Sequence, residues 1–170
     1  MPSFIGGVMK QILVFISIYV FSLSTFASPR IGLLESRKAL KEIAEKNGGY
    51  TYSMTFEDDR TINWYTTLFK VRDESVLERS LVGNLFDKLL GKQVYVSWDE
   101  KGEKVGSHVK GHPVKTLEEL HDECENLVEN ASYSFAMSYF ENGVIKMCEF
   151  VDIHGQVSGF ELDTFQGSRD

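Results

Sequence analysis

The chain has 170 residues, a formal net charge of −7 and two cysteines, and 42% of its residues are hydrophobic. This length suits one domain with a single core. The acidic balance disfavours nucleic acid and anionic lipid surfaces as partners, because both repel negative charge.

The N-terminus has the order of a secretory signal peptide. Lys10 precedes the apolar run Ile12–Phe26, and Thr25-Phe26-Ala27 provides small residues for cleavage. A membrane-spanning helix needs roughly 20 apolar residues, which is longer than this run. We therefore expect residues 1–27 to be removed on export, and residues 28–170 to form one domain in the periplasm or outside the cell, without a membrane attachment.

The first predicted elements are a helix and a pair of strands. Ile31–Asn47 repeats apolar side chains at helical spacing, and the glycines that follow Asn47 can adopt the left-handed conformation of a helix end. Tyr50–Glu57 alternates large apolar and hydroxyl side chains, which is typical of a half-buried strand. After a turn at residues 58–60, Ile62–Val71 is expected to be its partner strand.

Ser75–Leu90 admits two interpretations. Leucines recur every four residues from Leu77 to Leu89, which favours one helix. In the alternative that we favour, Val76–Leu81 completes the sheet and Val82–Leu90 forms a shorter helix. Gln93–Trp98 then alternates as a further strand.

A loop with several glycines, Lys101–Val114, leads to the clearest helix, Thr116–Asn130. Thr116 and Glu119 have the spacing of a capping box, in which each side chain accepts a hydrogen bond from a free backbone N–H. One face of this helix is apolar and the other is acidic.

Three strands are expected after this helix, at Tyr133–Phe140, Val144–Asp152 and Gln156–Phe165. A helix followed by an antiparallel meander would therefore occur twice, which predicts an α+β fold with helices packed on the meander. The alternating side chains of Tyr50–Phe56 recur 83 residues later, so the halves are similar, although a true duplication stays open.

The cysteines lie at positions that can face each other. Cys124 is on the apolar stripe of its helix, and Cys148 is on a predicted strand. In an oxidising compartment a disulfide is the simplest outcome, with two buried thiols or a metal or redox site as alternatives.

Three histidines are weak candidates for metal ligands. His121 lies one helical turn from Cys124, and His108 and His112 are four residues apart in the glycine-containing loop. These spacings fit no compact zinc motif, so we expect no cofactor. No hydrolase, zinc-protease, phosphate-loop or dinucleotide motif occurs either, and the sequence predicts no catalytic residues.

The acidic helix face is the predicted binding surface. Such a face is ordinarily solvated, but in a segment (116–170) with a net charge of −10 it could also attract a cationic partner. Its candidate contacts are Glu118, Glu119, Asp122, Glu123 and Glu125.

The chain resembles a group of exported bacterial proteins that carry a domain of unknown function. The motifs of this resemblance are Tyr50-Thr51-Tyr52, Val71-Arg72-Asp73, Thr116-Leu117, Tyr139 and Asp152, and it spans most of residues 40–152. The chain departs from that pattern at Glu74-Ser75 and Gly143-Val144-Ile145, and a strand follows His154-Gly155 in addition. The resemblance implies a small, exported, cystatin-like α+β domain and supplies no catalytic residue.

The sequence thus predicts a non-enzymatic module that binds a protein or peptide through the acidic face or through an open sheet edge. One alternative is an inhibitor or decoy of a cationic enzyme or antimicrobial peptide. Another is a periplasmic metal-handling protein.

Overall fold

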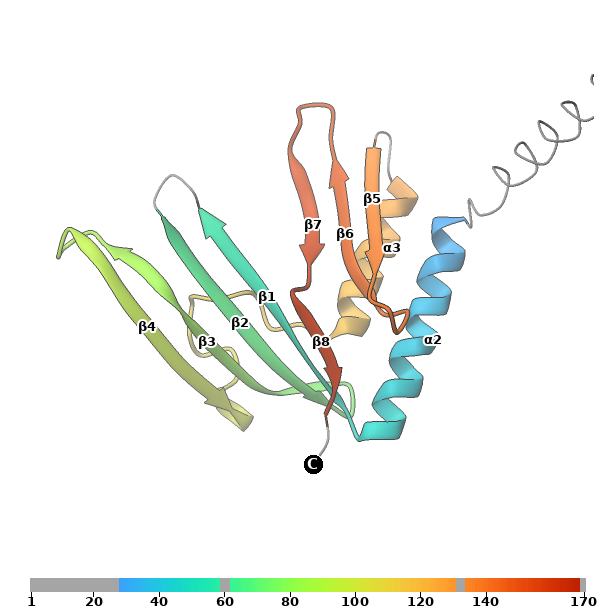
Figure 1. Ribbon diagram of the computed structural model, residues 1–170, viewed down its shortest axis with the longest axis horizontal. Coiled ribbons are helices and arrows are strands. Elements are labelled where there is room, and N and C mark those ends of the chain that lie inside the picture. Colours follow the sequence, from blue (N-terminus) through green and yellow to red (C-terminus); the bar gives the residue numbers. More distant parts are fainter. Residues whose placement is uncertain (1–27, 59–61, 131–133, 169–170) are drawn as a thin grey trace, which may run out of the picture.

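The computed structural model describes residues 28–58, 62–130 and 134–168 (Figure 1). Three predicted features lie outside these ranges: the signal peptide, the part of the 58–60 turn after Asp58, and Tyr133 at the start of a predicted strand. Two helices and two antiparallel sheets make up the described chain, so the predicted α+β class is confirmed. Neither of the described helices has the length and apolar character needed to cross a bilayer.

The larger sheet has five antiparallel strands in the order β4-β3-β2-β1-β8. Its strands are β1 (Tyr50–Asp58), β2 (Asn63–Arg72), β3 (Ser75–Asp87), β4 (Lys92–Lys101) and β8 (Thr164–Gly167). The alternation of β1 and β2 places Tyr50, Tyr52, Phe69 and Val71 on one buried face, which we call the inner face. The opposite, outer face carries hydroxyl and charged side chains together with exposed apolar ones such as Leu68 and Val82.

Strand β3 corrects the preferred interpretation of Ser75–Leu90. The expected helix at Val82–Leu90 is wrong, because residues 75–87 form one strand that pairs with β2 on one side and β4 on the other. A leucine spacing of four is also a multiple of the strand period of two, so Leu81 and Leu85 share one face of a strand as well as of a helix. The two neighbouring ladders decide between the possibilities.

The smaller sheet contains β5 (Ser134–Tyr139), β6 (Ile145–Val151) and β7 (Val157–Glu161). The expected single strand Gln156–Phe165 is wrong, because the chain leaves this sheet after β7 and joins the larger sheet as β8. Leu162, between the two strands, is completely buried and contributes to the core under both sheets.

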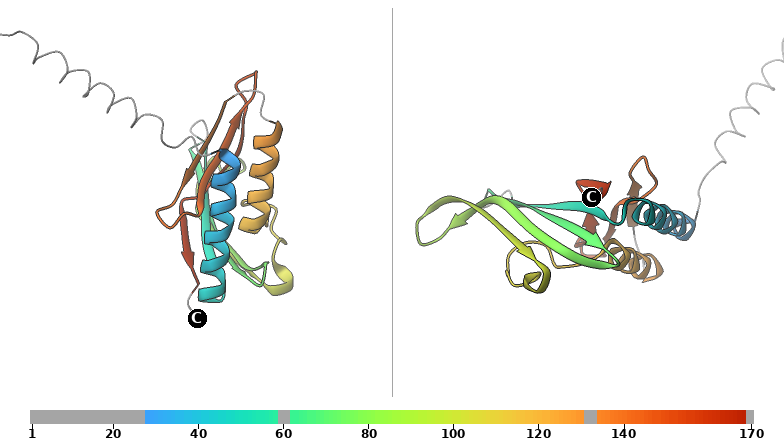
Figure 2. Two further views of the ribbon diagram at one scale, coloured as in Figure 1. Left: turned by 90° about the vertical axis from the view of Figure 1, so that its right-hand side faces the viewer. Right: turned by 90° about the horizontal axis from the view of Figure 1, so that it is seen from below.

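The helices lie side by side at the end of the molecule opposite to β4 (Figures 1 and 2). Helix α2 (Pro29–Asn47) begins with proline in its first turn and ends at Gly48, whose φ of 71° is the left-handed conformation expected there. Helix α3 (Leu117–Asn130) begins with the predicted capping box: Thr116 N donates to Glu119, and Glu119 N donates to Thr116 Oγ1.

A disulfide joins α3 to the smaller sheet. Cys124 of α3 is bonded to Cys148 of β6, and both residues are buried, as the sequence predicts. Each helix is followed by a meander, but equivalent side chains differ in burial: Tyr52 is fully buried, whereas Phe135, 83 residues later, is 39% exposed. The two halves therefore share an element order and use their strand faces differently.

Candidate functional site

The predicted acidic face of α3 is already occupied by contacts within the chain. Tyr50 Oη donates to Glu118 Oε2 at 2.6 Å, and Glu119 caps its own helix. Burial, followed by the nearby Glu118 carboxylate, raises the pKa of Tyr50, so this hydroxyl stays protonated and donates.

The remaining three carboxylates of that face are held by basic side chains. Arg37 of α2 contacts Asp122 at 2.5 Å and Glu125 at 3.3 Å, and Lys115 contacts Glu123. A cationic partner would have to displace these ion pairs, although each exposed pair contributes only about 0–1 kcal/mol. The face is consequently less acidic toward a partner than its sequence suggests.

His121 is a core residue and does not line a surface. Its Nδ1 lies 2.7 Å from Leu117 O and its Nε2 lies 2.8 Å from Ser36 Oγ, which in turn accepts from Ile145 N at 2.7 Å. Burial lowers the pKa of His121 and keeps the ring neutral. Nδ1 therefore donates to the carbonyl, and Nε2 accepts from the serine hydroxyl.

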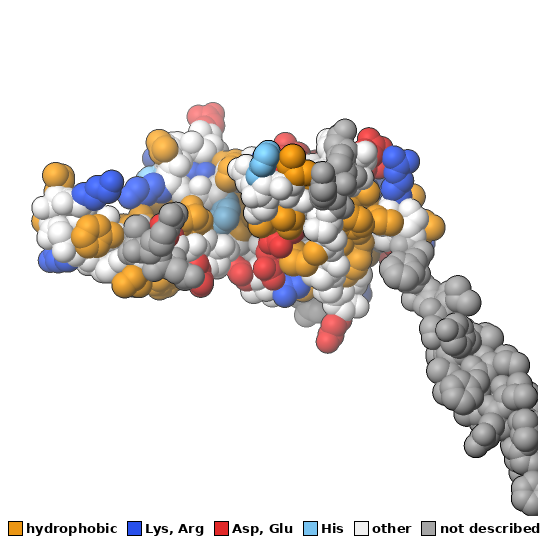
Figure 3. All heavy atoms as spheres, turned by 90° about the horizontal axis from the view of Figure 1, so that it is seen from above, with side chains coloured by type: hydrophobic (Ala, Val, Ile, Leu, Met, Phe, Trp, Pro, Cys, Tyr) orange, Lys and Arg blue, Asp and Glu red, His pale blue; other side chains and the backbone are white. Residues whose placement is uncertain are grey.

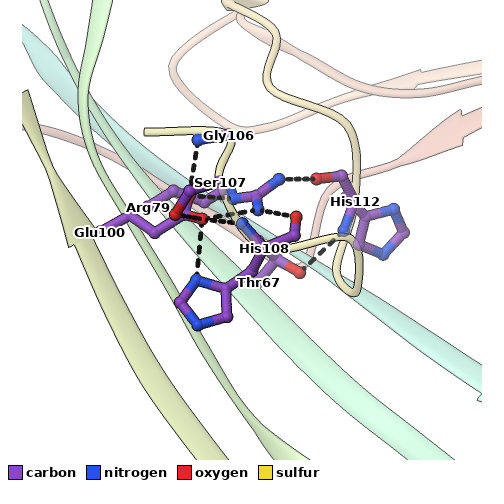
Figure 4. A network of polar contacts seen from close by, with 7 residues as sticks. All are labelled: Thr67, Arg79, Glu100, Gly106, Ser107, His108 and His112. Carbon is purple, nitrogen blue, oxygen red and sulfur yellow. Dashed lines mark hydrogen bonds and ion pairs between the residues drawn. The ribbon is translucent and has the colours of Figure 1, made fainter. Parts of the chain in front are cut away.

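His108 and His112 belong to a different part of the molecule, a buried polar network on the inner face of β3 and β4 (Figure 4). Arg79 and Glu100 form its centre, with Nε–Oε2 and Nη2–Oε1 distances of 2.9 and 3.2 Å. Arg79 also donates to His108 O and His112 O, which ties the loop after β4 to the sheet.

Glu100 accepts hydrogen bonds from several groups of that loop. Gly106 N and the Nδ1 of His108 lie 2.7 and 2.9 Å from its carboxylate, and Ser107 Oγ lies 3.1 Å away. Burial by itself would raise the pKa of Glu100, but hydrogen bonds from the backbone N–H groups of Gly106 and His108, from the His108 ring and from Arg79 lower it to about 2. The network therefore holds an ionised carboxylate inside the domain and fixes the loop over β4.

This buried network was not predicted from the sequence, although the sequence contains a recognisable signal for it. Glu100 has the same strand parity as Val96 and Trp98, and Arg79 has that of Leu81. A charged residue at an apolar position of a period-two pattern indicates a buried ion pair. His112, whose backbone carbonyl accepts a hydrogen bond from Arg79, belongs to the same network, and burial lowers the pKa of its ring.

The structure does not bring the three candidate histidines together. His121 lies under α3, and the other two lie on the loop over β4. Within the described ranges, no group of three or more His, Cys, Asp or Glu side chains has an arrangement suited to a metal ion.

A cleft of about 460 Å³ lies between α2 and the β2–β3 turn. Its floor is apolar, with Leu40, Tyr50 and Val71 all buried. Its rim carries both signs of charge, and the rim residues Arg37 and Glu118 already bond elsewhere. The cleft does not favour one class of ligand.

Strand β4 forms a long open edge of the larger sheet. It pairs with β3 on one side, lies at the margin of the five-stranded sheet, and extends for ten residues without a register shift (Figure 1). From Gln93 to Trp98 it contains no charge and no proline. Natural proteins usually protect such edges with charged residues, proline or bulges.

The ladder register identifies the backbone groups on this edge. Gly49 O accepts from Ser168 N and Ser53 O accepts from Asp163 N, so the odd-numbered residues of β1 direct their backbone groups toward β8. Because this direction alternates along each antiparallel strand, the registers of β1–β4 direct the N–H and C=O groups of Tyr95, Ser97 and Asp99 away from the sheet. No other described residue hydrogen-bonds to these groups.

Apolar side chains lie beside this edge on the outer face. The exposed fractions are 66% for Tyr95, 38% for Val82 and 36% for Trp64. Phe86 and Leu89 are exposed at and beyond the end of β3, and hydrophobic side chains are visible at this end of the molecule, on the left in Figure 3. The edge therefore offers both unpaired backbone groups and apolar surface.

Comparison of the chain with protein-family models, with curated proteins and with solved structures found no match. The resemblance based on short motifs stays a prediction.

Proposed function

We propose that this protein is a non-enzymatic binding module that captures an extended segment of another protein, or a peptide, by strand addition at β4. The observation that carries the proposal is the outward-facing backbone of Tyr95, Ser97 and Asp99, on a strand without proline, bulge or charge from Gln93 to Trp98. Main-chain hydrogen bonds supply affinity in this mode, and side chains on either face of the added strand supply selectivity.

Both faces of β4 can contribute to such a complex. Val94, Val96 and Trp98 are half-buried on the inner face, and Tyr95 is exposed on the outer face. Cross-strand pairs with these side chains would contribute roughly 0.2–1 kcal/mol each. Arg79 and Glu100 hold the loop after β4 and so keep its end in place.

We place this binding in the periplasm or outside the cell. The signal-like N-terminus and the disulfide between Cys124 and Cys148 support that setting, since disulfides persist in oxidising compartments. The internal ion pairs of α3 give no support to an inhibitor of cationic enzymes, and the separation of the histidines gives none to metal handling.

The test is a proline substitution that blocks the edge without breaking the sheet. Ser97→Pro removes one outward N–H, and proline is tolerated where a strand N–H faces solvent. Ser97→Ala is the matched control, because it keeps the N–H. Val96→Pro removes a ladder hydrogen bond to Gly83 and is expected to destabilise the fold.

A random peptide display library is selected on the wild-type protein and rescreened on the folded variants. Selected peptides should bind the Ser97→Ala variant as they bind the wild type, and at least about tenfold more weakly to the Ser97→Pro variant, since proline removes a main-chain hydrogen bond and obstructs the incoming strand. Unfolding temperatures verify that both variants are folded. Peptides that bind the Ser97→Pro variant undiminished, or a library that yields no binder, would overturn the proposal.

A further inference from the structure

The outer side of the β4 edge carries an ordered set of side chains. Tyr95, Ser97, Asp99 and Lys101 follow one another at alternate positions, so an aromatic ring lies at one end and two opposite charges at the other. An added strand would place its own alternate side chains beside these four.

The two charges differ in how they are held. Lys101 Nζ lies 3.0 Å from Glu78 Oε2, and Glu78 also lies 3.8 Å from Lys70, so Lys101 ends a row of alternating charges across the outer face. The contact with Lys101 lowers the pKa of Glu78. Asp99 is exposed and forms no hydrogen bond or salt bridge with any other described residue, and its charge acts on the neighbouring Lys101.

We infer that the segment added to β4 runs antiparallel to it, with an acidic residue opposite Lys101, a basic residue opposite Asp99 and an aromatic or β-branched residue opposite Tyr95. This inference rests on the proposed strand addition and specifies its register and partner. Every ladder of this sheet is antiparallel, and opposite charges on facing residues stabilise such pairs. The partner chemistry is an extended segment with the pattern acidic, any, basic, any, any, any, aromatic.

A second copy of this chain does not satisfy the pattern. If two β4 strands pair around Ser97, Tyr95 faces Asp99 and Val94 faces the buried Glu100, which leaves both charges of the edge without an opposite. A register that matches Asp99 with Lys101 is centred on Glu100, so it runs past the end of β4 at Lys101 after few pairs. The charges therefore favour a segment from a different protein.

Two labelled peptides of identical composition test the inference. The matched peptide is Glu-Val-Lys-Val-Thr-Val-Tyr, and the exchanged peptide is Lys-Val-Glu-Val-Thr-Val-Tyr, both acetylated and amidated. Because the net charges are equal, the overall acidity of the protein affects both alike. Fluorescence anisotropy with the wild type, the Asp99→Lys variant and the control Glu103→Lys measures each affinity. Glu103 lies just beyond β4, and the Glu103→Lys substitution changes the net charge by the same amount as Asp99→Lys.

The wild type and the Glu103→Lys variant should bind the matched peptide about tenfold more tightly, and the Asp99→Lys variant should lose that preference. If the wild type binds the two peptides with equal affinity and Ser97→Pro abolishes the binding of both, the proposed register is overturned. Strand addition at β4 would still stand. Binding that Ser97→Pro does not weaken would overturn both proposals. Sedimentation of the free protein as a dimer that Ser97→Pro dissociates would assign the edge to a second copy and overturn the foreign partner.

Discussion

Arg79 Nε and Glu100 Oε2 lie 2.9 Å apart on neighbouring strands, and their side chains are almost completely buried, at 4% and 1% exposure. Arg79 also lies over the ring of Trp98, 4.8 Å from its centroid, and that ring stacks on His108. The pair thus joins two strands and the loop that follows them. A buried pair of this kind is costly to break from one side, because the remaining charge stays desolvated.

Removing one partner should therefore destabilise the domain more than removing both. We expect Arg79→Met to lower the free energy of unfolding by about 3–5 kcal/mol, and Arg79→Met combined with Glu100→Leu to recover much of it. Urea unfolding at pH 7 measures both. The exposed-pair control Lys115→Ala should cost less than about 1 kcal/mol. A double variant no more stable than Arg79→Met alone would contradict the assignment.

The same carboxylate predicts a loss of stability in acid. The pKa of Glu100 is about 2 in the fold, and it is close to 4.3 in an unfolded chain. Between these values the unfolded chain binds a proton that the native state does not, so unfolding becomes easier as the pH falls from about 5 to 2. The contribution is about 3 kcal/mol. Urea midpoints across this range should fall less steeply in the Arg79→Met/Glu100→Leu variant.

His121 predicts a second pH dependence, at a higher pH. Its lowered pKa means that the unfolded chain takes up a proton below about 6.5 while the native state stays neutral. The contribution of the neutral His121 ring to the free energy of unfolding should therefore be fully present above that pH. It should decline as the pH falls from about 7 toward 5. Thermal unfolding of the wild type and of His121→Met measures this decline. An equally steep decline in the variant would assign it to other groups, such as His112.

Ser36 bridges His121 of α3 and the backbone of β6, so it should be sensitive to substitution. Its hydroxyl donates to His121 Nε2 and accepts from Ile145 N, all in the buried core. Ser36→Ala leaves both partners unsatisfied and is expected to cost about 1–3 kcal/mol. Denaturant unfolding tests this, with Ser97→Ala at an exposed position of β4 as the milder control. Equal stability of the Ser36→Ala variant and the wild type would contradict this geometry.

The disulfide should stabilise the attachment of α3. Cys124 and Cys148 are 24 residues apart, so reduction is expected to lower the free energy of unfolding by about 3 kcal/mol. Unfolding with and without reductant measures this effect, and a Cys124→Ala/Cys148→Ala variant should not respond to reductant. Intact mass after alkylation confirms the oxidation state. Two alkylated thiols in protein kept oxidised throughout would refute the bond.

Local pattern determined much of the fold. The period-two alternation of β1, the helical stripe of α3, its capping box and the position of Cys124 on the buried side all depend on residues close in sequence, so composition and spacing suffice to predict them. The acidic residues of α3 were also identified, but not the distant Arg37, Tyr50 and Lys115 that engage them.

Tertiary structure alone decided three features. It made residues 75–87 a strand, because a leucine spacing of four fits both a helix and a strand and only the ladders with β2 and β4 distinguish them. It divided residues 157–167 between two sheets. It also made β4 an edge, since strand order depends on pairings between distant residues, whereas the sequence of a strand specifies only which faces it presents.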